Sequence, residues 1–443
     1  MKGLPIFLVI IFFFGICLHS PIFSQKQPNV ILVLTDDQGI GDLGAHGNPW
    51  LKTPNMDAFY EDAVRLTNFH VSPLCTPTRA AIMTGRYPIN NGAWATFKGR
   101  DALSNTKTIA DIFKKNGYAT ALFGKWHLGD NYPNRPTDSG FDIAIHHLSG
   151  GIGELSDYWG NDYFDDVYQV NNQPKQFKGY CTDIWFDEAM KFMDSTINQP
   201  FFVYLPLNAP HDPLFVDEKY ARPYKNLEGT KILDANLYGM IANIDVNFGK
   251  LLKFLETKKL AKNTIVIFMS DNGTRFGYSR DRKLGFNKGF EGIKGSKLEG
   301  GHRVPFFIRW PEGKIKGGRD NNALTAHIDI LPTLASLCGF SIDDTMSIDG
   351  VDFSSIVKKP SLQIPKRTVF LHNRQDWRPP NRAEDVCILQ DEWRLLNQKE
   401  LYDIAKDPKQ EQNLANLYPD KVAELLSAHQ VFMKGVKEIP EYI

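Results

Sequence analysis

The sequence predicts an α/β fold with a large, mainly parallel central sheet flanked by helices, followed by a small antiparallel sheet with a helix. Five apolar runs, rich in β-branched and aromatic residues and bounded by polar residues, indicate strands buried on both faces. These runs are residues 29–35, 118–124, 201–207, 264–270 and 304–310. Stretches with apolar residues at helical spacing lie between them, including 108–117 and 237–260. Alternating strands and helices are typical of a parallel sheet.

The tail has a different pattern. Short strand candidates at 368–373 and 387–397 precede a closing helix from about residue 419. A chain of 443 residues suits one large domain and one small one. We therefore expect a main domain over 25–360 and a small C-terminal α+β subdomain over 361–443.

The N-terminal residues 1–24 predict a secretory signal peptide. Lys2 gives a positive start, residues 4–18 are mostly apolar, and a short polar-flanked stretch follows. The alternative is a membrane anchor, but this apolar stretch is shorter than the roughly 20 residues that span a bilayer. A lipoprotein with Cys17 at its modification site is a further alternative, but bulky residues precede this cysteine. We expect cleavage near Ser24, no stable membrane span, and a secreted or periplasmic protein.

The charge balance and the cysteine content restrict the kinds of ligand and fold that we expect. The chain has 51 Lys+Arg and 51 Asp+Glu, so no overall positive field favours nucleic acid, and an anionic ligand must be held by local charge. Removing the signal peptide leaves four scattered cysteines without a CxxC pair, which argues against a disulfide scaffold or zinc knuckle. One bridge among Cys181, Cys338 and Cys387 is compatible with export.

Two predicted strands end in oxygen-bearing side chains. Asp36 and Asp37 follow the strand at 29–35, and Asp271 and Asn272 follow the strand at 264–270. Each pair alone would more often form a turn. Ligands of such sheets bind beyond the carboxyl ends of the strands. Together the four residues predict a site for Ca²⁺ or Mg²⁺, which prefer oxygen, whereas zinc prefers His or Cys.

Cys75 lies where a helix is predicted to begin. Pro77 suits a first helical turn, and a helix start favours an anion. Arg79 is four residues further on and lies on the same helical face. The alternative is an ordinary buried cysteine.

A further group of basic side chains follows or neighbours predicted strands. Its members are Lys125, His127, His211 and Lys294. A lone histidine is usually structural, so these residues indicate a functional site only as a group.

Six segments resemble, in the same order, the motifs of the type I (formylglycine-dependent) sulfatase family, which includes the arylsulfatases. They are LTDDQG, CTPTRAAIMTGRYP, GKWHLG, NAPHDP, SDNG and KGSKLEGG. The resemblance covers nearly all of the mature chain, including ELYDIAKDP in the tail. It implies an alkaline-phosphatase-like fold and sulfate ester hydrolysis through S–O cleavage. It also implies that a maturase oxidises Cys75 to formylglycine (3-oxoalanine), which forms a sulfated enzyme intermediate.

The resemblance also implies roles for matching residues. Asp36, Asp37, Asp271 and Asn272 resemble the ligands of a Ca²⁺ or Mg²⁺ ion that also contacts the modified Cys75. Arg79 and Lys125 resemble partners of the formylglycine hydroxyls and the sulfate, and Lys294 resembles a sulfate-binding lysine. His211 resembles the general acid and His127 the group that takes a proton from the formylglycine diol. Ser149 is a further candidate site residue, but its spacing from the GKWHLG segment does not establish which family residue it matches.

The substrate class stays open within this resemblance. An exported enzyme suggests sulfated polysaccharides or oligosaccharides, such as ulvan, carrageenan or glycosaminoglycans. Tyr158, Trp159 and Trp377 could stack on sugars, and Arg374 and Arg378 could hold acidic groups, although each could be an ordinary loop residue. A phosphoesterase or phosphonate hydrolase on the same fold is one alternative. A catalytically inactive glycan-binding protein, with Cys75 kept as a thiol, is another.

Overall fold

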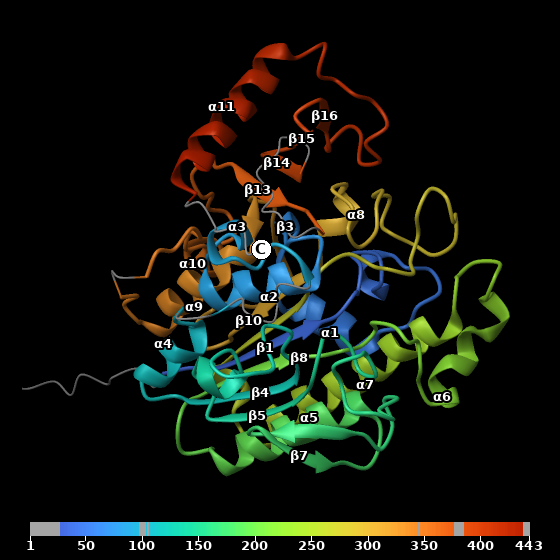
Figure 1. Cartoon of the computed structure of the whole chain (residues 1–443), viewed down its shortest axis with the longest axis vertical. Coiled ribbons are helices and arrows are strands. Elements are labelled where there is room, and N and C mark those ends of the chain that lie inside the picture. Colours follow the sequence, from blue (N-terminus) through green and yellow to red (C-terminus); the bar gives the residue numbers. More distant parts are fainter. Residues whose placement is uncertain (1–26, 97–102, 104–105, 344–345, 376–384, 437–443) are drawn as a thin grey trace, which may run out of the picture.

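The computed structural model describes residues 27–96, 103, 106–343, 346–375 and 385–436 (Figure 1). The predicted signal peptide and Trp377 and Arg378 lie outside these ranges. Within them, no helix is both long and apolar enough to cross a membrane. The four cysteines they contain, Cys75, Cys181, Cys338 and Cys387, are all free and buried.

A ten-stranded sheet runs through the centre of the molecule (Figure 1). Its strands, in spatial order, are β11 (Arg319–Asn321), β2 (Val64–Leu66), β10 (Phe306–Arg309), β9 (Thr264–Ser270), β1 (Asn29–Thr35), β8 (Phe201–Pro206), β4 (Ala119–Lys125), β5 (Ile143–His147), β6 (Val167–Val170) and β7 (Gln173–Gln176). The five strands from β9 to β5 are parallel to one another. β10, β6 and β7 are antiparallel to their neighbours, so the predicted mainly parallel sheet is confirmed.

Helices cover both faces of this sheet. Alternate residues of β1 point to opposite sides, so Val30 and Leu32 join one hydrophobic core while Ile31 and Val33 join the other. The first core is covered by α2 (Cys75–Thr84), α4 (Ile109–Lys115), α9 (Ile330–Cys338) and α10 (Ser354–Lys358). The second is covered by α1 (Pro54–Asp62), α5 (Cys181–Ser195) and α7 (Ala235–Thr257). Burial on both faces explains why the central strands are apolar throughout.

Shorter elements connect these layers. They are β3 (Phe69–His70) paired with β12 (Thr325–Ala326), and the helices α3 (Pro88–Asn91), α6 (Glu218–Ala221) and α8 (Glu299–His302).

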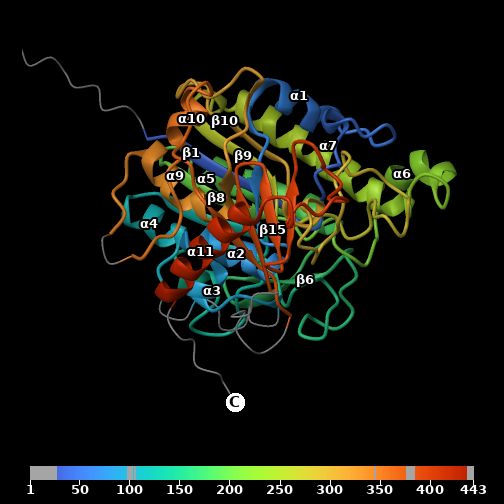
Figure 2. The same ribbon diagram turned by 90° about the horizontal axis from the view of Figure 1, so that it is seen from above.

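The tail forms the predicted antiparallel sheet with a helix packed on it. Its strands are β13 (Val369–His372), β14 (Val386–Gln390), β15 (Trp393–Leu396) and β16 (Glu400–Asp403), and the helix is α11 (Pro419–Gly435). Figures 1 and 2 show this unit lying over α2 and the main sheet. It shares one hydrophobic core with Ala81, Tyr87 and Ile89 of the main domain. The division of the chain at residue 360 stays a prediction.

Candidate active site

The ends of β1 and β9 bring two acidic pairs together. These strands are adjacent and parallel, with Thr35 opposite Ser270, so the residues that follow them emerge side by side. The backbone N–H of Asp37 donates to Asp271 Oδ1 at 3.2 Å, and Asn272 Nδ2 donates to Asp37 Oδ1 at 2.7 Å. All four side chains of the predicted ligand set are buried: Asp36, Asp37, Asp271 and Asn272.

The chemistry of this set fits a hard cation. Asp36 Oδ1 and Asn272 Oδ1 are buried, and neither accepts a hydrogen bond. Burial raises the pKa of Asp36, and burial together with the Asp36 carboxylate raises the pKa of Asp271 to about 6. Buried acceptors without partners are costly, and a divalent cation would satisfy them and offset the repulsion between the carboxylates.

Cations already surround the carboxylates. Lys125, at the end of β4, places Nζ 2.6 Å from Asp36 Oδ2, and Lys294 Nζ lies 2.7 Å from Asp37 Oδ1. Burial alone would raise the pKa of Asp37, but Lys294 and His211 hold it below its usual range. The site therefore combines oxygen donors with a positively charged rim, which suits an anion bound beside a cation.

Cys75 is the first residue of α2 and lies against this cluster. One turn later, the Arg79 guanidinium donates to Asp271 Oδ2 at 2.7 and 3.0 Å, and to the Lys125 carbonyl oxygen at 2.9 Å. Burial raises the pKa of the Cys75 thiol, and the nearby Lys125 and Lys294 only partly oppose this effect. An unmodified thiol here would be protonated at neutral pH, so it would be a poor nucleophile.

Two histidines flank Cys75. His127 has a left-handed backbone (φ 59°), and its Nδ1 is buried without a hydrogen-bond partner. His211 Nδ1 bonds to the Asp212 carbonyl oxygen at 2.7 Å, and its Nε2 lies 4.0 Å from Asp37 Oδ2. Burial lowers the pKa of both imidazoles, that of His211 to about 4. Both rings are therefore expected to be neutral at pH 7, and an anion bound beside them would favour protonation.

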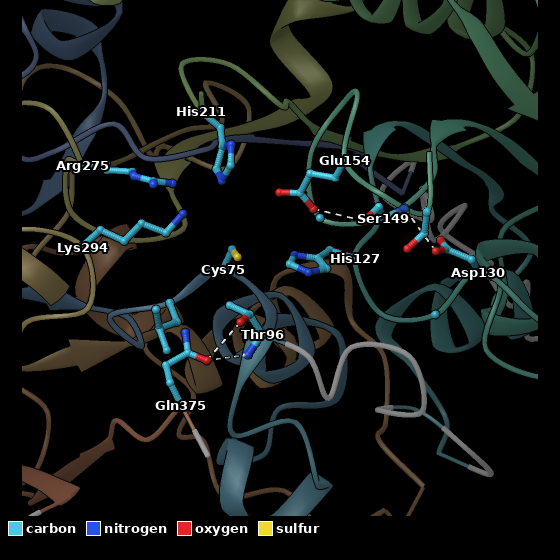
Figure 3. A pocket seen from close by; sticks show the side chains of 14 residues that line it. Cys75, Thr96, His127, Asp130, Ser149, Glu154, His211, Arg275, Lys294 and Gln375 are labelled. Atoms are coloured by element: carbon cyan, nitrogen blue, oxygen red, sulfur yellow. Dashed lines mark hydrogen bonds between the residues drawn. The ribbon is translucent and has the colours of Figure 1, made fainter. Parts of the chain in front are cut away.

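A cavity of about 540 Å³ opens above Cys75 (Figure 3). Of the predicted residues, Cys75, His127, His211 and Lys294 line it, as does Ser149. Arg79 and Lys125 lie beneath, fully buried. Several lining residues were not predicted from the sequence: Thr96, Asp130, Glu154, Ser156, Arg275 and Gln375. They come from irregular loops, where neither spacing nor a motif marked them.

The described residues that were predicted to contact the sugar away from Cys75 do not line this cavity. Arg374 forms an ion pair with Asp385 at 2.7 Å and is not part of the cavity lining, whereas the next residue, Gln375, is. Trp159 is fully exposed on the surface, and the Tyr158 hydroxyl bonds to Gln169. Neither aromatic residue lines the cavity.

The chain is similar to several known proteins. A family model described as "Sulfatase" matches residues 28–340, and one described as "N-sulphoglucosamine sulphohydrolase, C-terminal" matches 294–434. The chain is 31% identical to N-acetylgalactosamine-6-sulfatase of Canis lupus familiaris over 74% of this chain. It is 32% identical to the arylsulfatase of Hemicentrotus pulcherrimus over 76% of this chain. These alignments span 66% and 62% of the two relatives, just under two thirds of their length.

Solved structures show the same fold. A structure described as "Ps i-CgsB in complex with k-i-k-neocarrahexaose" has a TM-score of 0.82 at 26% identity, covering 93% of this chain and 94% of that one. The phosphonate monoester hydrolase of Agrobacterium radiobacter has a TM-score of 0.66 at 21% identity, covering 92% and 95%, and shows the fold alone. The predicted alkaline-phosphatase-like fold is confirmed.

Proposed function

Because this chain belongs to the sulfatase family, we propose that it hydrolyses sulfate esters of carbohydrates at the cavity above Cys75. The observation that carries the proposal is that four oxygen-bearing side chains following β1 and β9 meet beside Cys75, with the ammonium groups of Lys125 and Lys294 against two of them. Two of their oxygen atoms, Asp36 Oδ1 and Asn272 Oδ1, accept no hydrogen bond. Export of the chain and its maturation by a formylglycine-generating enzyme are part of this proposal.

Asp36, Asp37, Asp271 and Asn272 would hold a divalent cation, Ca²⁺ or Mg²⁺, which supplies charge stabilisation for the sulfate oxygens and the nucleophile. Oxidation of Cys75 to formylglycine supplies, after hydration, one hydroxyl that attacks sulfur and a second that allows sulfate to be expelled. A serine would lack the second hydroxyl.

The remaining residues position and neutralise the sulfate. Lys125 and Lys294 form ion pairs with Asp36 and Asp37, which supports a role for both in neutralising charge on the sulfuryl oxygens. Removing one such preorganised donor typically costs about 3–4 kcal/mol in the transition state. Arg79 holds Asp271 from below with two N–H groups, which fixes that carboxylate relative to Cys75.

The two histidines divide the proton transfers. His211 lines the cavity and has its Nδ1 fixed by the Asp212 carbonyl group, which leaves Nε2 free to protonate the leaving oxygen. His127 lines the same cavity and accepts the proton of the second hydroxyl. A bound sulfate anion would raise the pKa of His211 from its low resting value, because an opposite charge favours the protonated form.

The substrate class follows from the relatives and stays part of the proposal. Relatives are named for N-acetylgalactosamine 6-sulfate and arylsulfate chemistry, and a structural neighbour contains a carrageenan-type hexasaccharide. We infer a sulfated polysaccharide or oligosaccharide, with a galactose-type sugar as the first to test.

A desulfation screen tests the proposal. Protein made together with a formylglycine-generating enzyme is assayed on defined sulfated saccharides and aryl sulfates, and on matched phosphate and phosphonate esters, with released sulfate and phosphate measured. Release of sulfate by the wild-type protein but not by Cys75→Ala supports it, and mass analysis of the Cys75 peptide reports the modification. Faster release of phosphate than sulfate, or full activity of Cys75→Ala, would contradict it.

A further inference from the structure

The cavity above Cys75 has two electrostatically different walls. Lys294 and Arg275 lie on one side of Cys75, and Glu154 lies across the cavity from them (Figure 3). The carboxylate of Glu154 points into the cavity beside His127 and His211. An acidic side chain in a pocket for an anionic ester calls for an explanation, because it opposes binding of that ester.

Glu154 is an exposed loop residue whose carboxylate lies against two glycines. A Cβ atom on Gly150 would lie 2.6 Å from His127 Nε2 and 3.2 Å from Glu154 Oε2, and one on Gly151 would lie 3.0 Å from Glu154 Oε1. These two glycines leave the space that the carboxylate and the imidazole fill. Ser149 has a left-handed backbone (φ 62°), and its Oγ donates to Glu154 Oε2 at 3.1 Å.

Glu154 has no cationic partner within the described ranges of the chain, whereas Arg275 is paired with Asp212 at 2.7 Å and Lys294 with Asp37. A carboxylate accepts hydrogen bonds and donates none. The groups of a sulfated sugar that can donate to it are the free hydroxyls beside the ester. A second sulfate or a uronate carboxylate at that position would instead be repelled.

We propose that Glu154 is a specificity-determining residue that accepts hydrogen bonds from free hydroxyl groups of the sulfated sugar ring. It therefore selects rings that carry no second anionic group on that side. This inference rests on the proposed function, because it assigns the substrate class of the same cavity.

The test compares three kinds of sulfate ester in wild-type protein, Glu154→Gln and Glu154→Ala. The first is whichever of galactose 4-sulfate, galactose 6-sulfate and N-acetylgalactosamine 6-sulfate the wild-type protein hydrolyses fastest. The second is the disulfated form of that sugar, and the third is 4-nitrophenyl sulfate, which has no hydroxyl groups. The matched control is Glu312→Gln. Glu312 lies on an exposed turn and bonds to Lys262 just before β9, so it lies at the opposite end of this strand from the site.

We expect the ratio of kcat/KM for the monosulfated sugar to kcat/KM for 4-nitrophenyl sulfate to fall about 10- to 100-fold in Glu154→Ala, the usual effect of losing a charged hydrogen bond. The fall should be smaller in Glu154→Gln, which keeps an acceptor. The preference for monosulfated over disulfated sugar should fall in both variants, because both remove the negative charge. Glu312→Gln should change neither ratio.

Two results would overturn the inference. One is an unchanged ratio in both Glu154 variants. The other is a parallel loss on sugar and aryl sulfates, which would mean that Glu154 acts through the neighbouring His127 instead. Binding of the monosulfated sugar to Cys75→Ser protein, with and without Glu154→Ala, gives a readout that does not need turnover. If Glu154→Ala weakens this binding while wild-type protein releases no sulfate, the proposed function fails and the specificity assignment stands.

Discussion

Replacing Asn272 by aspartate should make the stability of the protein depend strongly on a divalent cation. Asn272 Nδ2 donates to Asp37 Oδ1 at 2.7 Å and to the Gly273 carbonyl oxygen at 3.0 Å. Asn272→Asp replaces this donor by an oxygen that faces two acceptors. With a cation bound, the aspartate gives the site one more negative charge, and the cation offsets the added repulsion.

The size of the effect can be worked out from these distances. Two unit charges at 2.7 Å repel each other by about 6 kcal/mol at an effective dielectric constant of 20. Protonation of the new carboxyl limits this penalty, because moving a pKa from 3.9 to 7 corresponds to about 4 kcal/mol. A loss of about 4 kcal/mol at pH 7 is a large part of the 5–15 kcal/mol that stabilises a typical protein.

Urea unfolding in EDTA and in excess CaCl₂ measures the effect. We expect Asn272→Asp to be destabilised by about 4 kcal/mol in EDTA and to regain more free energy of unfolding with Ca²⁺ than the wild-type protein. Asn226→Asp, on the exposed surface, should change neither value. Equal stability of Asn272→Asp and wild type in EDTA, or an equal gain with Ca²⁺, would refute the assignment of these oxygens as cation ligands.

Three other perturbations test the rest of the site and the fold. Lys294→Ala should lower kcat/KM for sulfate esters by about 10²–10³-fold while the circular dichroism spectrum stays native, and a loss below threefold would contradict its place at the sulfate. His211→Asn should lower kcat by about 10²–10⁴-fold on sugar sulfates but much less on 4-nitrophenyl sulfate, whose leaving group needs no proton; equal losses on both substrates would argue against an acid role. Truncation after residue 360 should give insoluble protein, because it exposes Ala81, Tyr87 and Ile89 of the shared core, and a soluble, cooperatively melting fragment would show that the tail is dispensable.

The central strands could be predicted from the sequence because burial on both faces makes them apolar without interruption. β1 and β9 have the predicted bounds. β7 (Gln173–Gln176) is exposed along its whole length and carries no such pattern, so it was missed. The direction of β10 was also not predictable, because side-chain periodicity is the same in parallel and antiparallel strands.

The candidate site was predictable as far as it rests on strand ends and one helix start. Adjacent parallel strands bring the residues after β1 and β9 together regardless of loop conformation. The sequence could therefore predict that Asp36 and Asp271 belong to one site. The salt bridges of Lys125 and Lys294 depend on side-chain packing and became visible only in three dimensions. Glu154 lies on a loop whose course is set by glycines and local hydrogen bonds, which give no periodic signal.

The burial of α2 bears on the order of events in biosynthesis. All ten residues of this helix are buried, and Cys75 is only 2% exposed. An enzyme that oxidises Cys75 would have to reach a side chain that the packed helix leaves almost inaccessible. Oxidation would therefore have to precede closure of the chain around α2, so a slowly folding variant would be converted more completely than a fast one.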